Sequence, residues 1–487
     1  MSDDLAFLDA LAQADLVRQG TVTPAELVDA AITRVEKLNP ELNAVIHPRF
    51  DAASAEAAGA LPDGPLRGVP IVIKDLDGST KGDPLHYGNQ ALKAAGRRAD
   101  HDTWLVERLR AAGCVVIGKT NTPEFGLMPT TEPTAYGPTR NPWNTDHGVG
   151  GSSGGSGAAV ASGMIPVGHA GDGGGSIRIP ASACGLFGLK PTRGRVSLGP
   201  DAGESWAGLV VRHAVTRTVR DSATVLDAIA GPMPGDPYYA PPPARRFAAE
   251  VGVDPGRLRI GVKTTAPANM GATDEECVSA ARDAADLLAS LGHEVVDAAP
   301  GALDDDALMA QFTVVLTTSV VHDMQDVARV IGRDVTADDV EPLTWAYYEA
   351  GLQNTAAQYL DALGAAHAWS RRVATWWEPA DRGGDGFDLL LTPTLAEPPP
   401  LIGDVVGTRK DPWHGMARAS AFAGYTAPFN VTGQPAMSVP LTWEASRNLP
   451  IGVQLVGAYA REDLLFRVAS QLEAARPWAD RRPVVHA

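Results

Sequence analysis

The chain alternates short apolar runs, rich in β-branched residues, with longer segments whose apolar groups recur at helical spacing. The short runs are typical of buried strands, and spacings of three and four residues predict one-sided helices. Residues 23–26, Thr-Pro-Ala-Glu, form a capping box with proline at the first helical position. The apolar residues that follow share one face of the predicted helix, and they are Leu27, Ala31, Val35 and Leu38.

Strand-like and helix-like segments follow one another along the whole chain. We predict strands at 69–73, 114–117, 258–262, 294–297, 387–392, 436–441 and 452–456. We predict helices at 5–17, 101–112, 217–230, 274–291 and 461–475, and expect most of 305–378 to be helical. Strands that alternate with helices favour an α/β fold with a substantially parallel sheet.

A proline-rich segment at residues 232–243 marks a linker or a long surface connection. On this basis we expect essentially one large domain made of four segments. They are N-terminal helices at 1–62, a core at 63–231, a connection and mostly helical cap at 232–380, and a C-terminal part at 381–487 that returns to the core.

The composition is that of a globular protein with an acidic balance. The chain has 41 Lys and Arg against 58 Asp and Glu, a net charge of −17, which would repel a phosphate backbone and argues against a nucleic-acid partner. The three cysteines form no CxxC pair, which indicates neither a disulfide framework nor a zinc site and fits a reducing cytoplasm. We see no signal peptide and no apolar run long enough to cross a membrane.

One nucleotide-binding pattern is present but does not have the right context. Residues 113–120, Gly-Cys-Val-Val-Ile-Gly-Lys-Thr, match GxxxxGK[ST]. A phosphate-binding loop needs its variable positions in a loop and a helix at the lysine. Here those positions read as a strand, and Pro123 interrupts a following helix, so we predict a core strand that ends in a turn.

Two glycine-rich tracts carry the candidate chemistry. The first, at 150–157, contains Ser152, and the second, at 172–178, contains Ser176. A small-residue helix near 158–164 separates them, so the second tract can fold back over the first. Taken alone, Ser176 could be a turn residue and Ser152 part of a helix cap.

A nucleophilic serine needs a base, and the sequence offers two kinds. His147 and His169 lie near the tracts, but neither belongs to an ordered Ser–Asp–His pattern. Lys74 ends a predicted buried strand; its pKa, ordinarily about 10.4, must fall toward 7, which burial among uncharged hydroxyls can achieve. Asp75 would oppose this effect, but on a strand it faces the opposite way.

Five segments together resemble the amidase signature family. They are Gly-Val-Pro-Ile-Val-Ile-Lys-Asp at 68–75, Gly-Lys-Thr-Asn-Thr-Pro-Glu-Phe at 118–125, Gly-Gly-Ser-Ser-Gly-Gly at 150–155, Gly-Gly-Ser-Ile-Arg-Ile-Pro at 174–180 and Cys-Gly-Leu-Phe-Gly-Leu-Lys-Pro at 184–191. The resemblance implies a central mixed, largely parallel twisted sheet covered by helices on both faces. It also implies a Ser–cisSer–Lys triad with Ser176 as nucleophile, Ser152 as bridge after a cis peptide bond, and Lys74 as base.

The same resemblance implies the supporting groups and the reaction. The amides of Gly173, Gly174, Gly175 and Ser176 would form an oxyanion hole. Asp172 and Arg178 would pair and brace the loop, and Ser153 is expected to hydrogen-bond Lys74. An acyl-enzyme on Ser176 would be hydrolysed by water, with no metal and no cofactor.

The substrate is the least defined feature. Residues 170–173, Ala-Gly-Asp-Gly, replace the Gly-Thr-Asp-Thr of many members, which leaves the loop roomier. Residues 131–136, 141–144 and 458–465 most resemble the branch with the nylon-oligomer aminohexanoate cyclic-dimer hydrolases, to which urethanases are similar. Candidate substrate-binding residues are Met128, Thr130 and Leu316; their apolar character and the lack of an obvious cation suggest a neutral, hydrophobic amide or carbamate.

Two other functions are compatible with the same residues. One is the glutamine-hydrolysing component, of A type, in a tRNA-dependent amidotransferase, and the other is a non-catalytic binding protein on the same scaffold. The joint presence of Lys74, Ser152 and Ser176 argues against the binding protein. The sequence leaves the oligomeric state open, a homodimer included.

Overall fold

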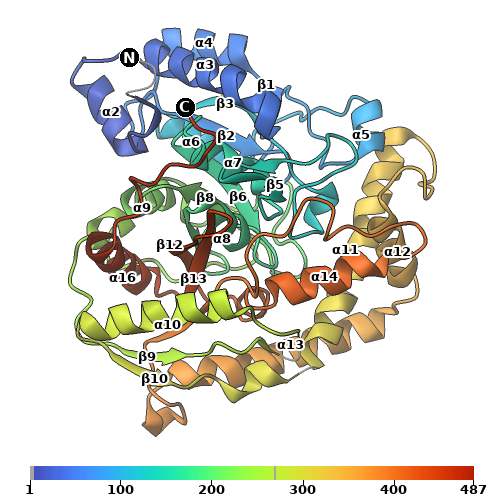
Figure 1. The fold of residues 1–487 in the computed structure, drawn as a ribbon. Helices are drawn as coiled ribbons and strands as arrows, with labels where there is room; N and C mark the ends of the chain where they lie inside the picture. Colours follow the sequence, from blue (N-terminus) through green and yellow to red (C-terminus); the bar gives the residue numbers. More distant parts are fainter. Residues whose placement is uncertain (1–4, 268–269, 306) are drawn as a thin grey trace.

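One sheet of eleven strands runs through the chain in a computed structural model that describes residues 5–267, 270–305 and 307–487 (Figure 1). From one edge to the other, the strands are β1 (Val45–Pro48), β3 (Val115–Thr120), β2 (Pro70–Lys74), β6 (Val167–Asp172), β8 (Val211–Thr216), β7 (Phe187–Lys190), β12 (Ala436–Glu444), β13 (Leu449–Gly457), β11 (Leu389–Pro393), β9 (Arg259–Val262) and β10 (Glu294–Asp297). A second, two-stranded sheet pairs β4 (Arg140–Asn141) with β5 (Asn144–Gly148).

The large sheet is mixed, as predicted. Strands β3, β2 and β6 pair in parallel, and so do β11, β9 and β10. The strands between these two blocks pair antiparallel, as does edge strand β1 with β3. The parallel block of β3, β2 and β6 carries the first candidate residues at its carboxyl ends, the usual position for sites in α/β sheets.

Helices cover both faces of the sheet, which confirms the predicted fold class. One face packs against α2 (Ala10–Arg18), α6 (Trp104–Ala111), α9 (Val219–Ile229), α10 (Glu275–Ser290) and α16 (Glu462–Ala475). The other packs against α3 (Pro24–Leu42), α4 (Phe50–Ala58), α7 (Gly154–Ala161) and α8 (Arg178–Cys184), and further along against α11 (Ala307–Ile331), α12 (Pro342–Gly351) and α13 (Ala356–Ala374). Shorter helices are α5 (Gln90–Ala94), α14 (Trp413–Ala423) and α15 (Pro428–Val431).

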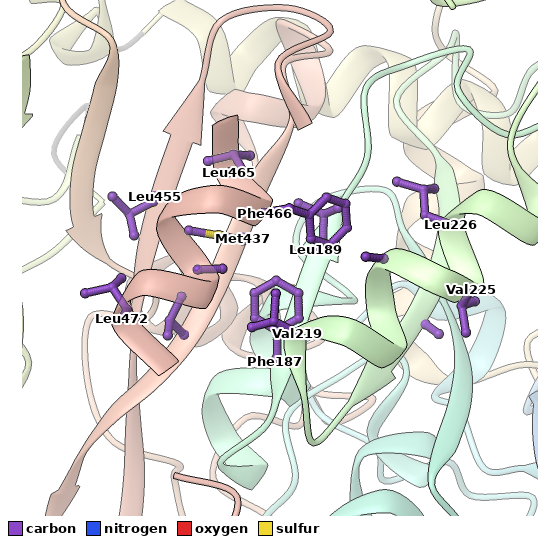
Figure 2. Packing of buried hydrophobic residues seen from close by; sticks show 14 of the residues in the cluster. Phe187, Leu189, Val219, Val225, Leu226, Met437, Leu455, Leu465, Phe466 and Leu472 are labelled. Carbon is purple, nitrogen blue, oxygen red and sulfur yellow. The ribbon is translucent and has the colours of Figure 1, made fainter. Parts of the chain in front are cut away.

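The core lies where apolar strand positions meet these helices. Figure 2 shows Phe187 and Leu189 of β7 beneath α9 and α16, with Phe466 of α16 between the two layers. The rings of Phe187 and Phe466 lie 6.3 Å apart. Burying aromatic and aliphatic groups of this size contributes about 1.5–3 kcal/mol each, so this packing fixes the strands that carry the site.

Most predicted elements are present, with small differences at their ends. The helix predicted at 5–17 begins instead at Ala10, because the Asp9 side chain caps it by accepting a hydrogen bond from Ala12 N at 2.9 Å. The Thr23 capping box is formed, and Pro24 stands in the first turn of α3. The segment that resembled a phosphate-binding loop is strand β3.

The segments of the predicted division share one sheet. Strand β1 comes from 1–62, β9 and β10 come from 232–380, and β11, β12 and β13 come from 381–487. In the part of the chain described here, none of the helices has both the length and the hydropathy needed to cross a bilayer.

Candidate active site

Lys74 is the last residue of β2 and points into the interior. Within this strand, Ile71 and Ile73 pack with α2 and α6, whereas Val72 packs with α7 on the opposite face. Because side chains alternate along a strand, Lys74 shares the face of Val72. The side chain is buried, and its Nζ donates a hydrogen bond of 2.7 Å to Ser152 Oγ.

The first glycine-rich tract brings Ser152 to this amine. The Gly151–Ser152 peptide bond is cis, and α7 begins two residues later at Gly154. A side chain on Gly151 would collide with the Thr130 backbone, so the close approach requires glycine. Thr130 therefore packs behind the tract and does not line the cavity, which makes its predicted role in substrate binding wrong.

Ser176 lies in the loop that links β6 to α8. Its side chain is partly exposed and lines a cavity of about 600 Å³ together with Lys74 and Ser152. The structure thus gathers the three predicted catalytic residues on one cavity wall, although they come from three separate segments. A volume of this size is typical of a small-molecule site.

The glycines before Ser176 are held by the packing around them. Gly173 and Gly174 line the cavity, while Gly175 lies behind them with a φ of +140°. Thr426 Oγ1 donates a hydrogen bond of 2.6 Å to Gly174 O, and a side chain at Gly175 would collide with this threonine. The loop conformation therefore depends on glycine at position 175 and on Thr426 beside it.

A buried ion pair braces the same loop. Arg178 donates to both carboxylate oxygens of Asp172, at 2.9 and 3.0 Å, and both side chains are fully buried. Asp172 also accepts a hydrogen bond from Ile177 N at 3.1 Å. Burial alone would raise the pKa of Asp172, but the Arg178 guanidinium outweighs it and lowers that pKa to about 2.

Burial also sets the protonation of the candidate base. It lowers the pKa of Lys74 below its ordinary value, because the charged ammonium loses its hydration. The Asp77 carboxylate, 3.6 Å from Lys74 Nζ, opposes this shift in part. The sequence analysis placed only uncharged hydroxyls around the amine and missed Asp77. The available signal was Gly171, because a side chain there would collide with the Asp77 carboxylate.

Asp75 faces away from the amine, as strand alternation requires. Its carboxylate lies 3.0 Å from Lys119 Nζ and 3.6 Å from His47 Nε2. His47, Asp75 and His86 bring one ligand atom each to within 4.8 Å of one another, the arrangement of a potential metal site. Lys119 and Tyr136 already bind members of this group, so it forms a buried polar network behind Lys74.

The histidine alternative for the base is not supported by the geometry. His169 is buried beneath β2, and its Nδ1 accepts a hydrogen bond of 3.3 Å from Lys74 N. Burial lowers the pKa of His169 well below its ordinary value. His147 lies 2.7 Å from Pro399 O, and neither histidine lines the cavity that contains Ser176.

Ser153 is placed differently from the expectation. Its Oγ donates a hydrogen bond of 3.2 Å to Gly171 O rather than binding Lys74. The reason is that Ser152 occupies the position facing the amine, while Ser153 turns toward strand β6. Ser153 therefore joins the first tract to the strand that precedes Ser176.

The cavity walls differ from one side to the other. Met128 and Leu316, both predicted to bind substrate, lie on an apolar side with Phe125, Phe312 and Tyr347. The opposite side carries polar groups, and these include Asp77, Ser79, Thr103, Asp201 and Arg212. The expectation of a pocket without a cation is thus wrong, because Arg212 of β8 lines the wall.

Comparisons with known proteins agree with this site. A family model described as Amidase matches residues 26–466. The 6-aminohexanoate-cyclic-dimer hydrolase of Paenarthrobacter ureafaciens is 45% identical over 484 residues, which cover 98% of this chain and 96% of that protein. A solved structure of 6-aminohexanoate cyclic dimer hydrolase with substrate superposes with a TM-score of 0.94 at 43% identity, covering 99% of this chain and 100% of the other.

More distant structures show how the alternatives rank. A bacterial aryl acylamidase described as an amidase signature enzyme matches with a TM-score of 0.84 at 27% identity and covers 98% of each chain. The A-type component of the glutamyl-tRNA(Gln) amidotransferase from Thermotoga maritima reaches 0.74 at 28% identity and covers 95% of this chain and 94% of its own. The hydrolases match better, so amide hydrolysis is favoured over the amidotransferase alternative. The chain belongs to the amidase signature family, and it is an amidase.

Proposed function

We propose that this amidase cleaves neutral amides through an acyl-enzyme on Ser176, with Ser152 as proton relay and Lys74 as base. The observation that carries the proposal is the hydrogen bond of 2.7 Å from Lys74 Nζ to Ser152 Oγ, within the cavity that Ser176 lines. A buried amine with a lowered pKa can accept a proton near neutral pH, which a solvated lysine cannot.

In the first half-reaction, Ser176 Oγ attacks the amide carbon and forms a C–O bond. Its proton passes to Ser152 Oγ, whose own proton passes to Lys74 Nζ. The relay then returns a proton to the leaving nitrogen as the C–N bond breaks, which gives the acyl-enzyme and a free amine. Water enters the second half-reaction in the same way and releases the carboxylic acid.

The glycine loop supplies the stabilising groups in this proposal. Amides of Gly173, Gly174, Gly175 and Ser176 would donate to the oxyanion of the tetrahedral intermediate. One such donor is worth about 3 kcal/mol of barrier. The Asp172–Arg178 pair keeps this loop in place, because it fixes residues on both sides of the nucleophile.

The substrate proposal rests on the relatives and the cavity. The most similar proteins reported above are named for a cyclic dimer of 6-aminohexanoate, a neutral cyclic amide, and one more distant structure is an aryl acylamidase. The apolar wall formed by Met128, Leu316 and Phe312 suits methylene chains or aryl rings. We include aryl carbamates as the second substrate class, because they present the same carbonyl to Ser176.

Other features fit a small-molecule enzyme of a reducing compartment. The three cysteines, Cys114, Cys184 and Cys277, are free and buried. The net charge of −17 disfavours a nucleic-acid partner. A cytoplasmic location is part of this proposal.

The test is hydrolysis of the 6-aminohexanoate cyclic dimer and of a simple anilide by purified protein. Ser176→Ala should abolish turnover of both, and Lys74→Met should reduce kcat by about 10²–10⁴, the usual contribution of a general base. His169→Gln is the matched control for the rejected base. If Lys74→Met lowers kcat only a few-fold while His169→Gln abolishes turnover, the assignment of the base is wrong.

A further inference from the structure

Arg212 occupies an unusual position beside the proposed catalytic residues. Strand β8 pairs with β6 so that Arg212 lies directly opposite Gly171. Directly opposed residues in an antiparallel pair point to the same face, so the arginine side chain extends over the side of the sheet where Asp77 lies against Gly171. Arg212 is 8% exposed, and it lines the cavity that contains Ser176.

The Arg212 guanidinium is only partly satisfied by the protein. One Nη donates a hydrogen bond of 3.1 Å to Leu198 O, and the buried Nε has no partner among the described residues. No carboxylate of the described residues lies within ion-pair distance of it, since Asp77 contacts Lys74 instead. A guanidinium has five N–H donors, and a buried one ordinarily has acceptors for them.

A second unsatisfied group lies on the same wall. Thr103 is 2% exposed and lines the cavity, and its Oγ1 has no partner among the described residues. The next residue, Trp104, donates its amide to Gly199 O at 3.1 Å. Because Arg212 binds the adjacent Leu198 O, the same short loop brings Thr103 and Arg212 together.

The charges around this wall favour a neutral ligand group. Asp77 offsets the positive charge of Arg212 at longer range, as its effect on the pKa of the guanidinium shows. Asp201 pairs with His101 at 2.9 Å, and Glu204 accepts a hydrogen bond from Tyr238 at 3.0 Å. The wall therefore offers free donors without a large excess of positive charge, which suits a carbonyl oxygen better than a carboxylate.

We propose that Arg212 and Thr103 bind a second carbonyl oxygen of the substrate, so that the enzyme prefers compounds with two amide groups to compounds with one. The inference rests on the proposed function, because the first carbonyl is the one that Ser176 attacks. The two amides lie on different sides of one cavity: the reacting amide at Ser176, and the other against the polar wall. The substrate class is thus a cyclic or linear diamide whose connecting chains lie along the apolar side.

The test compares two rings of equal size. One is the 6-aminohexanoate cyclic dimer, and the other is a lactam in which methylene groups replace one of its amides. We expect a higher kcat/KM for the diamide, and we expect Arg212→Met to reduce that preference about tenfold or more, as loss of a charge-assisted hydrogen bond should. Thr103→Val keeps the side-chain shape and should reduce the preference by a smaller factor.

Controls separate this inference from the proposed function and from misfolding. Arg108→Met removes a part-buried arginine that binds Ile229 O and Gly231 O outside the cavity, and it should leave the preference unchanged. Anilide hydrolysis that is lost in Ser176→Ala tests the proposed function by itself. If thermal melting shows that Arg212→Met is unfolded, Arg212→Lys and Thr103→Val decide. Equal kcat/KM for the two rings, or an unchanged preference in the folded variants, would overturn the inference.

Discussion

Replacing Arg178 by methionine is the most direct probe of how the nucleophile loop is held. The guanidinium makes two hydrogen bonds to the Asp172 carboxylate at 2.9 and 3.0 Å. It also donates to Thr426 O, Gln454 Oε1 and Asn430 Oδ1 at 2.7–2.8 Å. Methionine fills much of the same volume, so the substitution removes the donors and leaves a buried carboxylate without its counter-charge.

Breaking a buried ion pair by removing one partner costs about 3–5 kcal/mol. At about 2.1 cal/mol/K per residue, unfolding of the 487-residue chain has an entropy of about 1 kcal/mol/K. A loss of about 4 kcal/mol should therefore lower Tm by about 4 °C. Because Ser176 lies two residues before Arg178, kcat on the anilide should fall as well.

The pH dependence gives a second readout with a definite sign. The pKa of Asp172 falls from 3.8 to about 2 in the folded protein, because Arg178 outweighs the effect of burial. This carboxylate therefore contributes stability that is complete above about pH 4 and is lost as the pH falls toward 2, about 2 kcal/mol in all. Without Arg178, burial raises the pKa of Asp172, so protonation relieves the variant and its deficit should shrink on acidification.

The assay is thermal melting by circular dichroism at about pH 7 and pH 4, alongside anilide turnover. Arg67→Met is the matched control, because Arg67 is 45% exposed and only 3.8 Å from the exposed Asp63. Surface pairs of this kind contribute about 0–1 kcal/mol, so the control should shift Tm by about 1 °C or less. The reasoning fails if Arg178→Met behaves like this control, or if its deficit is as large at pH 4 as at pH 7.

Two further predictions concern the loop and a buried carboxyl. Gly175→Ala should lower Tm and reduce kcat at least about tenfold, because φ of +140° is strained for alanine and its Cβ would collide with Thr426; circular dichroism and anilide kinetics measure both. Burial, aided by the neighbouring Glu341, raises the pKa of Glu124 from 4.5 to about 8. Its charge is therefore disfavoured in the fold, and stability should fall as the pH rises from about 5 to 8. Glu124→Gln should flatten that fall in melting curves, and an equally steep fall in the variant would contradict the assignment.

The sequence was sufficient to predict the fold class and to nominate Lys74, Ser152 and Ser176. Each nomination depended on local signals, a strand that ends at a lysine and two glycine-rich tracts, and on the family resemblance. Such signals survive without coordinates, because strand alternation and glycine-dependent turns are properties of short segments. The end of the first helix was displaced because Asp9 caps it, a side-chain choice that periodicity does not reveal.

Residues that enter the site through the sheet were not predictable in the same way. Arg212 and Asp77 come to the cavity because β8, β6 and β2 lie side by side, and their order in the sheet is not their order in the chain. Thr130 was misplaced for a related reason: its segment does pass the cavity at Met128, but two residues later it packs behind Gly151. Spacing along the chain cannot distinguish these cases, because long-range strand pairing decides them.

The adjacency of these three strands also explains how an acidic group can sit beside the proposed base. Asp77 stabilises the ammonium that Lys74 becomes after it takes a proton, but the same carboxylate works against the neutral amine that must accept it. Arg212 acts in the opposite direction, since its positive charge lowers the pKa of Lys74 and attracts Asp77. Gly171 makes the arrangement possible, because a side chain there would take the space of the carboxylate. The proton affinity of the base is therefore set by three neighbouring strands, and a substrate carbonyl bound to Arg212 would alter it together with the binding.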